Sequence, residues 1–267
     1  MLKTTQHFLR GFSGAMNRLP DPRRDEQCVY TQAHLLWLGA LLFLMHLGSR
    51  RQMRFERLAE AFMQNLAKLS GQNGLDTVAD PDTLAYYAEH VPVPPVEKLL
   101  AWITARLIRI KALDPFRLLE YFPVAIDGSQ ICLFEQQPWP GCPHRELSNA
   151  QVQYFAYVLD AKLVTPCGMA LSLATEMLSN EGGRLRWKIE NEGFNVQKND
   201  GYEMEHPYSE HPNAFKIFCL LLLMAHYLSQ LILHGSLIRT LAESFGSARN
   251  FARRLAESMR NHLLPDS

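Results

Sequence analysis

The length, composition and charge of the chain exclude several classes of protein. It has 267 residues, of which 47% are hydrophobic and 20% charged, and this balance is typical of a globular protein with a real core. Lysine plus arginine equals aspartate plus glutamate at 27 each, so the net charge gives no overall attraction to nucleic acid. The five cysteines form no CxxC pair, which argues against a disulfide framework or a zinc ribbon and predicts a cytoplasmic location.

Residues 1–120 are predicted to form a helical region that is a candidate for DNA binding. Asp80 supplies an N-cap and Pro81 a first-turn proline, so a helix should begin there. The short helices around this cap suit a helix-turn-helix module or a plain helical bundle equally well, because no residue indicates base readout. Apolar residues at helical spacing predict further helices over 32–47, 51–69 and 96–110.

Basic residues gather in local clusters even though the net charge is zero. A local cluster can bind phosphate groups in a chain that is neutral as a whole. The clusters are Arg23–Arg24, Arg50–Arg57, Arg184–Lys188 and Arg253–Arg254.

The apolar pattern changes to that of strands in residues 121–183. The stretch FPVAIDGSQICLFEQ has two apolar runs separated by Asp127 and Gly128. Taken alone, an Asp-Gly pair between such runs is typical of a hairpin turn. Two more strands are predicted over 153–164 and 169–178, joined by a short turn.

Residues 184–267 are predicted to return to helices. The stretch RLRWKIENEGFNVQKNDGYEMEH begins as an amphipathic helix, in which Arg186 and Glu190 form an i,i+4 pair. A carboxylate flanked by cations on a helical face is suited to phosphate chemistry or to binding a metal ion. The alternative is that this mixed-charge helix is only a solvated surface. An apolar helix over 215–233 and a basic amphipathic segment over 237–264 follow.

Two apolar stretches are predicted to be buried core helices and not membrane spans. Residues 33–47 are too short to cross a bilayer, and residues 214–233 carry several polar side chains. We also expect no signal peptide, because the first residues lack an apolar run followed by a small-residue cleavage site.

The stretch from Arg184 to His206 resembles the motif around the final carboxylate of DDE transposases from bacterial insertion sequences. Arg186, Glu190 and Lys198 carry the resemblance, although the lysine lies one position later than the commoner spacing places it. Glu192 is a second candidate for the acid. The AIDGS segment resembles the first strand of the RNase H-like fold of that family, with the first catalytic aspartate, here Asp127, at the carboxyl end of the strand.

The resemblance implies a fold, a chemistry and partners. The fold class would be α/β in the broad sense, more narrowly a mostly helical α+β fold. It would have a helical N-terminal region, a partial RNase H-like sheet and C-terminal helices. Asp127 and Glu190 would be catalytic and would hold Mg²⁺ or Mn²⁺, while Arg186, Lys188 and Lys198 would contact DNA. The expected partners are the DNA ends of the element and a second copy in a homodimer, with no membrane.

The interval between the two carboxylates is too short for a complete catalytic core. Only 63 positions (190 − 127) separate Asp127 from Glu190. The intervening strands and helices of an RNase H-like core need on the order of 70 to 80 residues. We infer an internal deletion near residues 180–184 that removed the second catalytic aspartate, so catalysis should be impaired.

Two alternatives remain open at this point. The first is an active nuclease that uses Asp127, Glu190 and a third acid such as Asp160 or Glu176. The second is a helical DNA-binding or interaction module without enzymatic activity.

Overall fold

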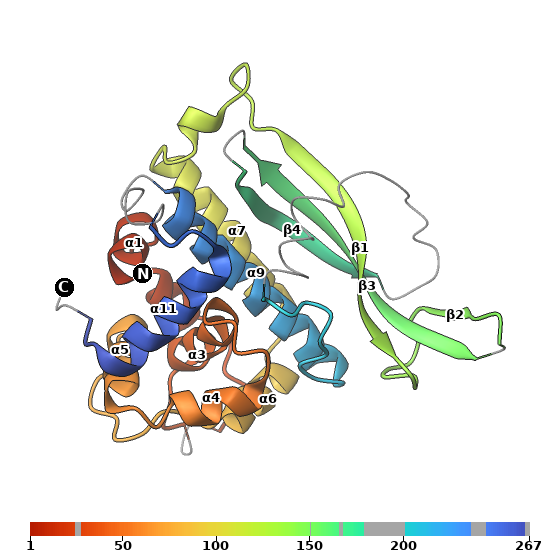
Figure 1. The fold of residues 1–267 in the computed structure, drawn as a ribbon, viewed down its shortest axis with the longest axis horizontal. Coiled ribbons are helices and arrows are strands. Elements are labelled where there is room, and N and C mark those ends of the chain that lie inside the picture. The colour runs from red at the N-terminus through yellow and green to blue at the C-terminus, as the bar shows by residue number, and fades with distance from the viewer. Residues whose placement is uncertain (25–27, 150, 166–167, 179–200, 236–243, 265–267) are drawn as a thin grey trace.

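Helices and one antiparallel sheet make up the part of the chain that the structure describes, as predicted for a mixed α+β fold. The structure is a computed structural model, and it describes residues 1–24, 28–149, 151–165, 168–178, 201–235 and 244–264. In Figure 1 the helices form a body on one side and the sheet lies on the other. The helices α7 and α9 lie next to strand β4 of the sheet.

The elements follow one another as helices, then strands, then helices. The helices before the sheet are α1 (Leu2–Phe8), α2 (Phe12–Met16), α3 (Gln32–Leu44), α4 (Arg50–Glu56), α5 (Glu60–Ser70), α6 (Pro81–His90) and α7 (Val93–Arg109), followed by a 3₁₀ turn at Asp114–Phe116. The strands are β1 (Val124–Phe134), β2 (His144–Glu146), β3 (Val152–Val164) and β4 (Ala170–Leu178). The described helices after the sheet are α9 (Pro212–His234) and α11 (Ala248–Asn261).

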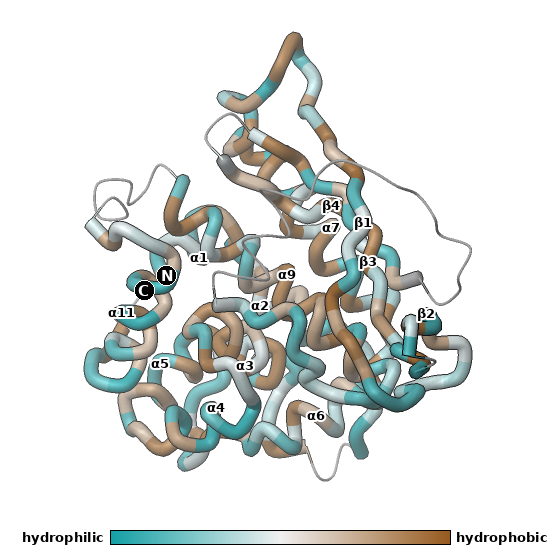
Figure 2. Tube along the Cα trace, turned by 45° about the vertical axis from the view of Figure 1, so that its right-hand side comes forward, coloured by the Kyte–Doolittle hydropathy of each residue, from teal (hydrophilic) through white to brown (hydrophobic). Residues whose placement is uncertain are grey.

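The helix α9 lies at the centre of the helical body. The helices α3, α6 and α7 pack against it, and α11 packs against α5, so helices from both ends of the chain share one core. Figure 2 shows apolar residues along α3 and α9, and almost every described side chain of both is buried, as predicted. Among the described helices, α9 alone is long and apolar enough to cross a membrane by length and composition, and 89% of its apolar window is buried inside the protein.

Local capping fixes where several helices begin. The Thr31 hydroxyl accepts a hydrogen bond from the His34 amide at the start of α3. The Asp80 carboxylate accepts one from the Asp82 amide at 3.0 Å, which confirms the predicted start of α6. The helix α7 begins three residues before the predicted residue 96. Its two prolines are tolerated because the amides of a first turn have no partner within the helix.

The predicted helix over 51–69 is in fact two helices. The chain leaves helical geometry at Ala59, between α4 and α5. The break allows Arg57 to donate to the Val78 carbonyl at 2.9 Å and to the Asp80 carboxylate at 2.8 Å. It also leaves Phe55 and Leu58 exposed, although their spacing had placed them on the buried face. Tertiary ion pairing outweighed the local helical pattern here.

The strand β3 is the centre of the sheet, and every pairing is antiparallel. The strand β1 lies along one edge of β3, while β4 and the short β2 lie along the other. The bounds of β3 and β4 match the predicted strands to within one residue. Among the described residues, the outer edge of β1 has no strand partner.

The strand β1 runs straight through Asp127 and Gly128, which corrects both sequence expectations for this pair. Its pairing with β3 continues from Val124 to Phe134, so Asp127 neither ends a strand nor begins a hairpin turn. The glycine is needed for a different reason. A Cβ at Gly128 would lie 2.6 Å from the Tyr157 ring, so only glycine lets that tyrosine pack across the strand.

Candidate functional site

A row of polar side chains crosses the sheet at Asp127. In the strand register, Asp127 on β1 lies opposite Asp160 on β3, and Asp160 lies opposite Thr175 on β4. Residues that lie opposite one another in antiparallel strands project from the same face of the sheet. The fold therefore places two carboxylates side by side on one face, although they are far apart in the sequence.

One oxygen of Asp127 has no partner among the described residues. Its Oδ1 accepts a hydrogen bond from the Gly128 amide at 2.7 Å. Its Oδ2 is buried and has no described hydrogen-bond partner. A buried carboxylate oxygen without a partner is costly, so it marks a place where a cation or a donor would be stabilising.

Asp160, in contrast, is fully engaged. Its carboxylate accepts hydrogen bonds from Lys162 at 2.5 Å, Ser172 at 2.7 Å and Thr175 at 3.0 Å. The Asp160 and Lys162 side chains are 0% and 3% exposed, so this is a buried ion pair. Its oxygens are already occupied by an ammonium group and two hydroxyls. Asp160 is therefore a structural residue of the sheet and a poor candidate for the third metal-binding acid.

The spacing of Asp160 and Lys162 in the sequence could have indicated that they form an ion pair. Asp160 and Lys162 are two residues apart on one strand, so they share a face. The strand was predicted, but the ion pair between Asp160 and Lys162 was not, because the local sequence does not show that their face of the strand is buried.

The polar layer continues onto α9. His226 on this helix is buried, and its burial together with the positive charges of Lys162 and His234 lowers the pKa of its imidazole to about 3. The imidazole is therefore neutral, and Gln230 lies 3.2 Å from its Nε2. Lys162 thus places its charge near α9, between the helical body and the sheet.

The described end of the Arg184–His206 motif returns to the core beside β1 and α9. Tyr202 is buried and its hydroxyl donates to the Ser229 hydroxyl on α9. The Cys132 thiol on β1 donates to the Met204 carbonyl at 3.5 Å. Tyr202 and Met204 are therefore held against α9 and against the strand that carries Asp127.

Gly201 allows this return. Its φ is +95°, and a Cβ there would lie within 2.3 Å of the His46 ring. Both the left-handed backbone and the close approach require glycine. Gly201 is thus a contact point with the residues that follow α3.

The other predicted site residues lie outside the described part of the chain. They are Arg186, Lys188, Glu190, Glu192 and Lys198. Of the two expected ligands of Mg²⁺ or Mn²⁺, Asp127 is the one that lies among the described residues. Within the described ranges, no group of three His, Cys, Asp or Glu side chains is placed to hold a metal ion.

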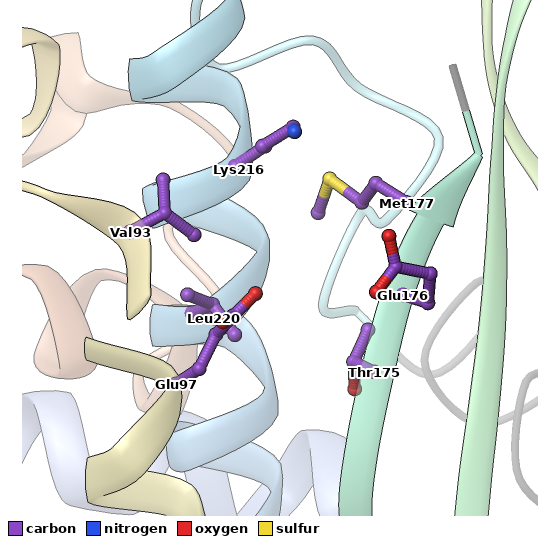
Figure 3. A pocket seen from close by; sticks show the side chains of 7 residues that line it. All are labelled: Val93, Glu97, Thr175, Glu176, Met177, Lys216 and Leu220. Atoms are coloured by element: carbon purple, nitrogen blue, oxygen red, sulfur yellow. The ribbon is translucent and has the colours of Figure 1, made fainter. Parts of the chain in front are cut away.

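Glu176, the other candidate for a third acid, lies on the far side of β3 from Asp127. It lines a small cavity of about 30 Å³ between β4, α7 and α9. In Figure 3, Glu97 and Lys216 face it from the two helices. In the strand register Thr175, not Glu176, lies in line with Asp160 and Asp127, so Glu176 projects from the opposite face of the sheet and is not placed to share a metal ion with Asp127. The cavity itself is smaller than the roughly 300 Å³ at which small-molecule sites begin.

Ion pairs within the protein occupy most of the N-terminal basic clusters. Arg54 and Arg57 on or just after α4 pair with Asp80 at the start of α6, and Arg54 also pairs with Asp82. Arg23 pairs with Asp21 at 2.6 Å and is 9% exposed. Asp80 and Asp82 thus reduce the positive charge of this cluster, and the paired arginines are less available to phosphate groups than the sequence suggested.

The basic cluster on α11 remains on the surface. Arg253 and Arg254 are exposed, and the Arg254 guanidinium lies 5.6 Å from the centre of the Phe245 ring. Arg260 on the same helix pairs with Glu56.

No known protein family, curated protein or solved structure matches this chain, so its function has to be argued from these residues.

Proposed function

We propose that the chain is a shortened transposase of the DDE type, which binds DNA but is catalytically impaired. The observation that carries the proposal is the position of the motif tail. Tyr202 and Met204 close the stretch that resembles the glutamate motif, and they pack beside β1 and α9. Asp127 lies five residues before Cys132 on that same strand, so the described end of one stretch with the resemblance contacts the other, which supports the proposal.

The antiparallel order of the strands also supports the proposal. The resemblance implies a first strand carrying Asp127, followed by strands two and three. The chain has β1, β3 and β4 in that order, each antiparallel to its neighbour. The described sheet ends at the outer edge of β1, where a further strand bearing the second aspartate would be expected.

Impaired catalysis follows from the number of available carboxylates. Transposases of this type use three acids to hold two divalent metals, which activate the attacking group and stabilise the leaving oxygen. Asp127 has one oxygen without a hydrogen-bond partner among the described residues, and Glu190 is a candidate to share a metal ion with it. Asp160 is occupied by Lys162, and Glu176 lies across the sheet. Two acids cannot provide a complete two-metal site, so strand cleavage and transfer should be lost.

DNA binding would depend on local basic groups, because the net charge is zero. Arg186, Lys188 and Lys198 are the proposed contacts near the site, and Arg253 and Arg254 add an exposed basic surface. Binding through phosphate contacts weakens steeply as salt concentration rises.

The test is a plasmid-nicking assay combined with a DNA-binding titration. The purified chain is incubated with supercoiled plasmid and Mn²⁺, beside the variants Asp127→Ala and Glu190→Ala. We expect no nicking by the chain or by either variant, and DNA binding at low salt that falls at higher salt. Nicking that requires both Asp127 and Glu190 would show that the site is complete, which would contradict the proposed impairment.

The alternative is a helical interaction module without enzymatic activity. The ion pairs of Arg54 and Arg57 with Asp80 and Asp82 favour it, because they weaken one basic cluster that DNA could have used. Absence of DNA binding at low salt would select this alternative. Binding lost in the variant Arg253→Glu/Arg254→Glu, but not in Arg51→Glu on α4, would instead place DNA on α11.

A further inference from the structure

The segment that joins α7 to β1 projects from the body as a hairpin tip, at the top of Figures 1 and 2. Leu118 and Tyr121 exchange two backbone hydrogen bonds across it, at 2.8 and 2.9 Å. The two turn residues between them, Leu119 and Glu120, have φ angles of +48° and +69°. Two-residue turns of this kind favour Asn-Gly, and a leucine in the left-handed region is strained.

Contacts at the base hold this strained tip in place. The Arg117 guanidinium lies 4.6 Å from the centre of the Phe122 ring. The same group donates to the Glu120 carbonyl at 3.0 Å and to the Asp114 carboxylate at 3.1 Å. Strained backbone persists only where its surroundings fix it, and it gathers at functional surfaces. The tip, held by these contacts, thus presents Leu119 to the outside.

The tip and the start of β1 together expose an unusual amount of apolar surface, which we name the apolar edge. Monomeric proteins rarely expose a contiguous apolar patch larger than a few hundred Å². The residues of the apolar edge and their exposed fractions are Leu118 (64%), Leu119 (85%), Tyr121 (78%), Val124 (51%) and Ile126 (63%).

The size of the apolar edge suits a protein partner. Its side chains expose on the order of 700 Å², so two such surfaces facing one another would bury roughly 1,400 Å², within the range of stable protein interfaces. It offers no free cation to a nucleic acid, because Arg117 is held by Asp114 and by the Glu120 carbonyl.

We propose that the apolar edge is the interface with a second copy of this chain. The strand β1 is eleven residues long, contains no proline, lysine or arginine, and has no described strand partner on its outer side. Exposed edges of this composition pair with other strands. Two identical strands that run antiparallel about a two-fold axis place apolar residues opposite apolar residues in both copies. This inference does not depend on DNA binding or on catalysis.

The test is sedimentation equilibrium of the full chain over a wide range of concentrations. We expect a dimer whose dissociation constant rises at least ten-fold in Leu119→Lys and in Ile126→Lys. The matched control is Leu58→Lys, which changes a leucine of similar exposure on the helical body and should leave the dissociation constant unchanged.

A second variant separates loss of the interface from loss of folding. Leu119→Gly removes the exposed side chain and also relieves the left-handed backbone, so its melting temperature should hold or rise while the dimer weakens. The proposal is overturned if the chain is a monomer at every concentration, in which case the apolar edge has another occupant. A dimer that all three apolar-edge variants leave unchanged would overturn it equally.

Discussion

The helical body and the sheet bury different kinds of polar residue. In the body, α3 and α9 bury apolar side chains on every side, and the polar side chains buried among them, such as His34, Ser229 and Gln230, carry no charge. The sheet instead buries the Asp160–Lys162 ion pair and exposes Val124 and Ile126.

This difference indicates which region is organised for stability alone. An apolar core stabilises in proportion to the area removed from water and needs no particular geometry. A buried ion pair needs excellent geometry to offset desolvation, and exposed apolar residues gain nothing in a monomer. The buried Asp160–Lys162 pair and the exposed Val124 and Ile126 are therefore features that the stability of a folded monomer does not explain. All of them lie in the sheet that also carries Asp127.

Acid should produce the largest effect, because it acts on both regions at once. Burial lowers the pKa of His34 in the body to about 4 and that of His226, which faces the sheet, to about 3. The same groups have a pKa near 6.5 in the unfolded chain, so below pH 6.5 the unfolded state binds protons that the folded state does not. The free energy of unfolding should fall as pH drops from 6.5 to 4, by about 1 kcal/mol per unit for each histidine.

Urea denaturation at pH 7 and pH 4.5 measures this loss. The variants His34→Gln and His226→Gln should each reduce the pH dependence between these values. Equal pH dependence in the wild type and both variants would show that neither imidazole is protonated on unfolding in this range.

Breaking the buried ion pair should produce the next largest effect. Asp160→Ala leaves the Lys162 ammonium buried without its carboxylate, which should cost about 3–5 kcal/mol in the free energy of unfolding. The matched variant Asp127→Ala removes a carboxylate that makes only a local hydrogen bond, and it should be nearly neutral or stabilising.

Urea denaturation of both variants tests this contrast. The double variant Asp160→Leu/Lys162→Met should recover most of the loss, because it removes both charges together. If Asp160→Ala is no less stable than Asp127→Ala, the ion pair does not stabilise the sheet.

The cap of α6 should produce the smallest effect. Asp80→Ala removes the hydrogen bond to the Asp82 amide and the ion pair with Arg57, and should cost about 1–2 kcal/mol. Asp76→Ala, a change of the same type in the preceding connection, serves as the control and should have little effect. Thermal melting of the two variants at low and high salt would separate the cap from the ion pair, because salt weakens only the latter.

The sequence predicted the elements whose cause is local. The Asp80–Pro81 cap placed α6 to the residue, and alternation placed β3 and β4 to within one residue. Uniform apolar composition identified α3 and α9 as core helices. These predictions succeeded because capping, strand alternation and apolar burial depend on residues close together in the chain.

The errors arose where distant residues compete with local pattern. Asp127–Gly128 has the sequence of a turn, yet pairing with β3 keeps it extended and Tyr157 occupies the space that a side chain would fill. The helix over 51–69 is interrupted because Arg57 reaches Asp80, more than twenty residues later. Neither partner can be identified from the local sequence.

The candidate site divides in the same way. Composition and a few neighbouring residues were enough to predict that Asp127 lies in a strand region and that α9 is buried. Long-range contacts alone show that Asp160 is bound by Lys162, that the motif tail packs beside β1 and that Leu119 is exposed on a strained tip. Those three facts depend on strand register and on packing between segments far apart in the chain, which a linear pattern does not specify.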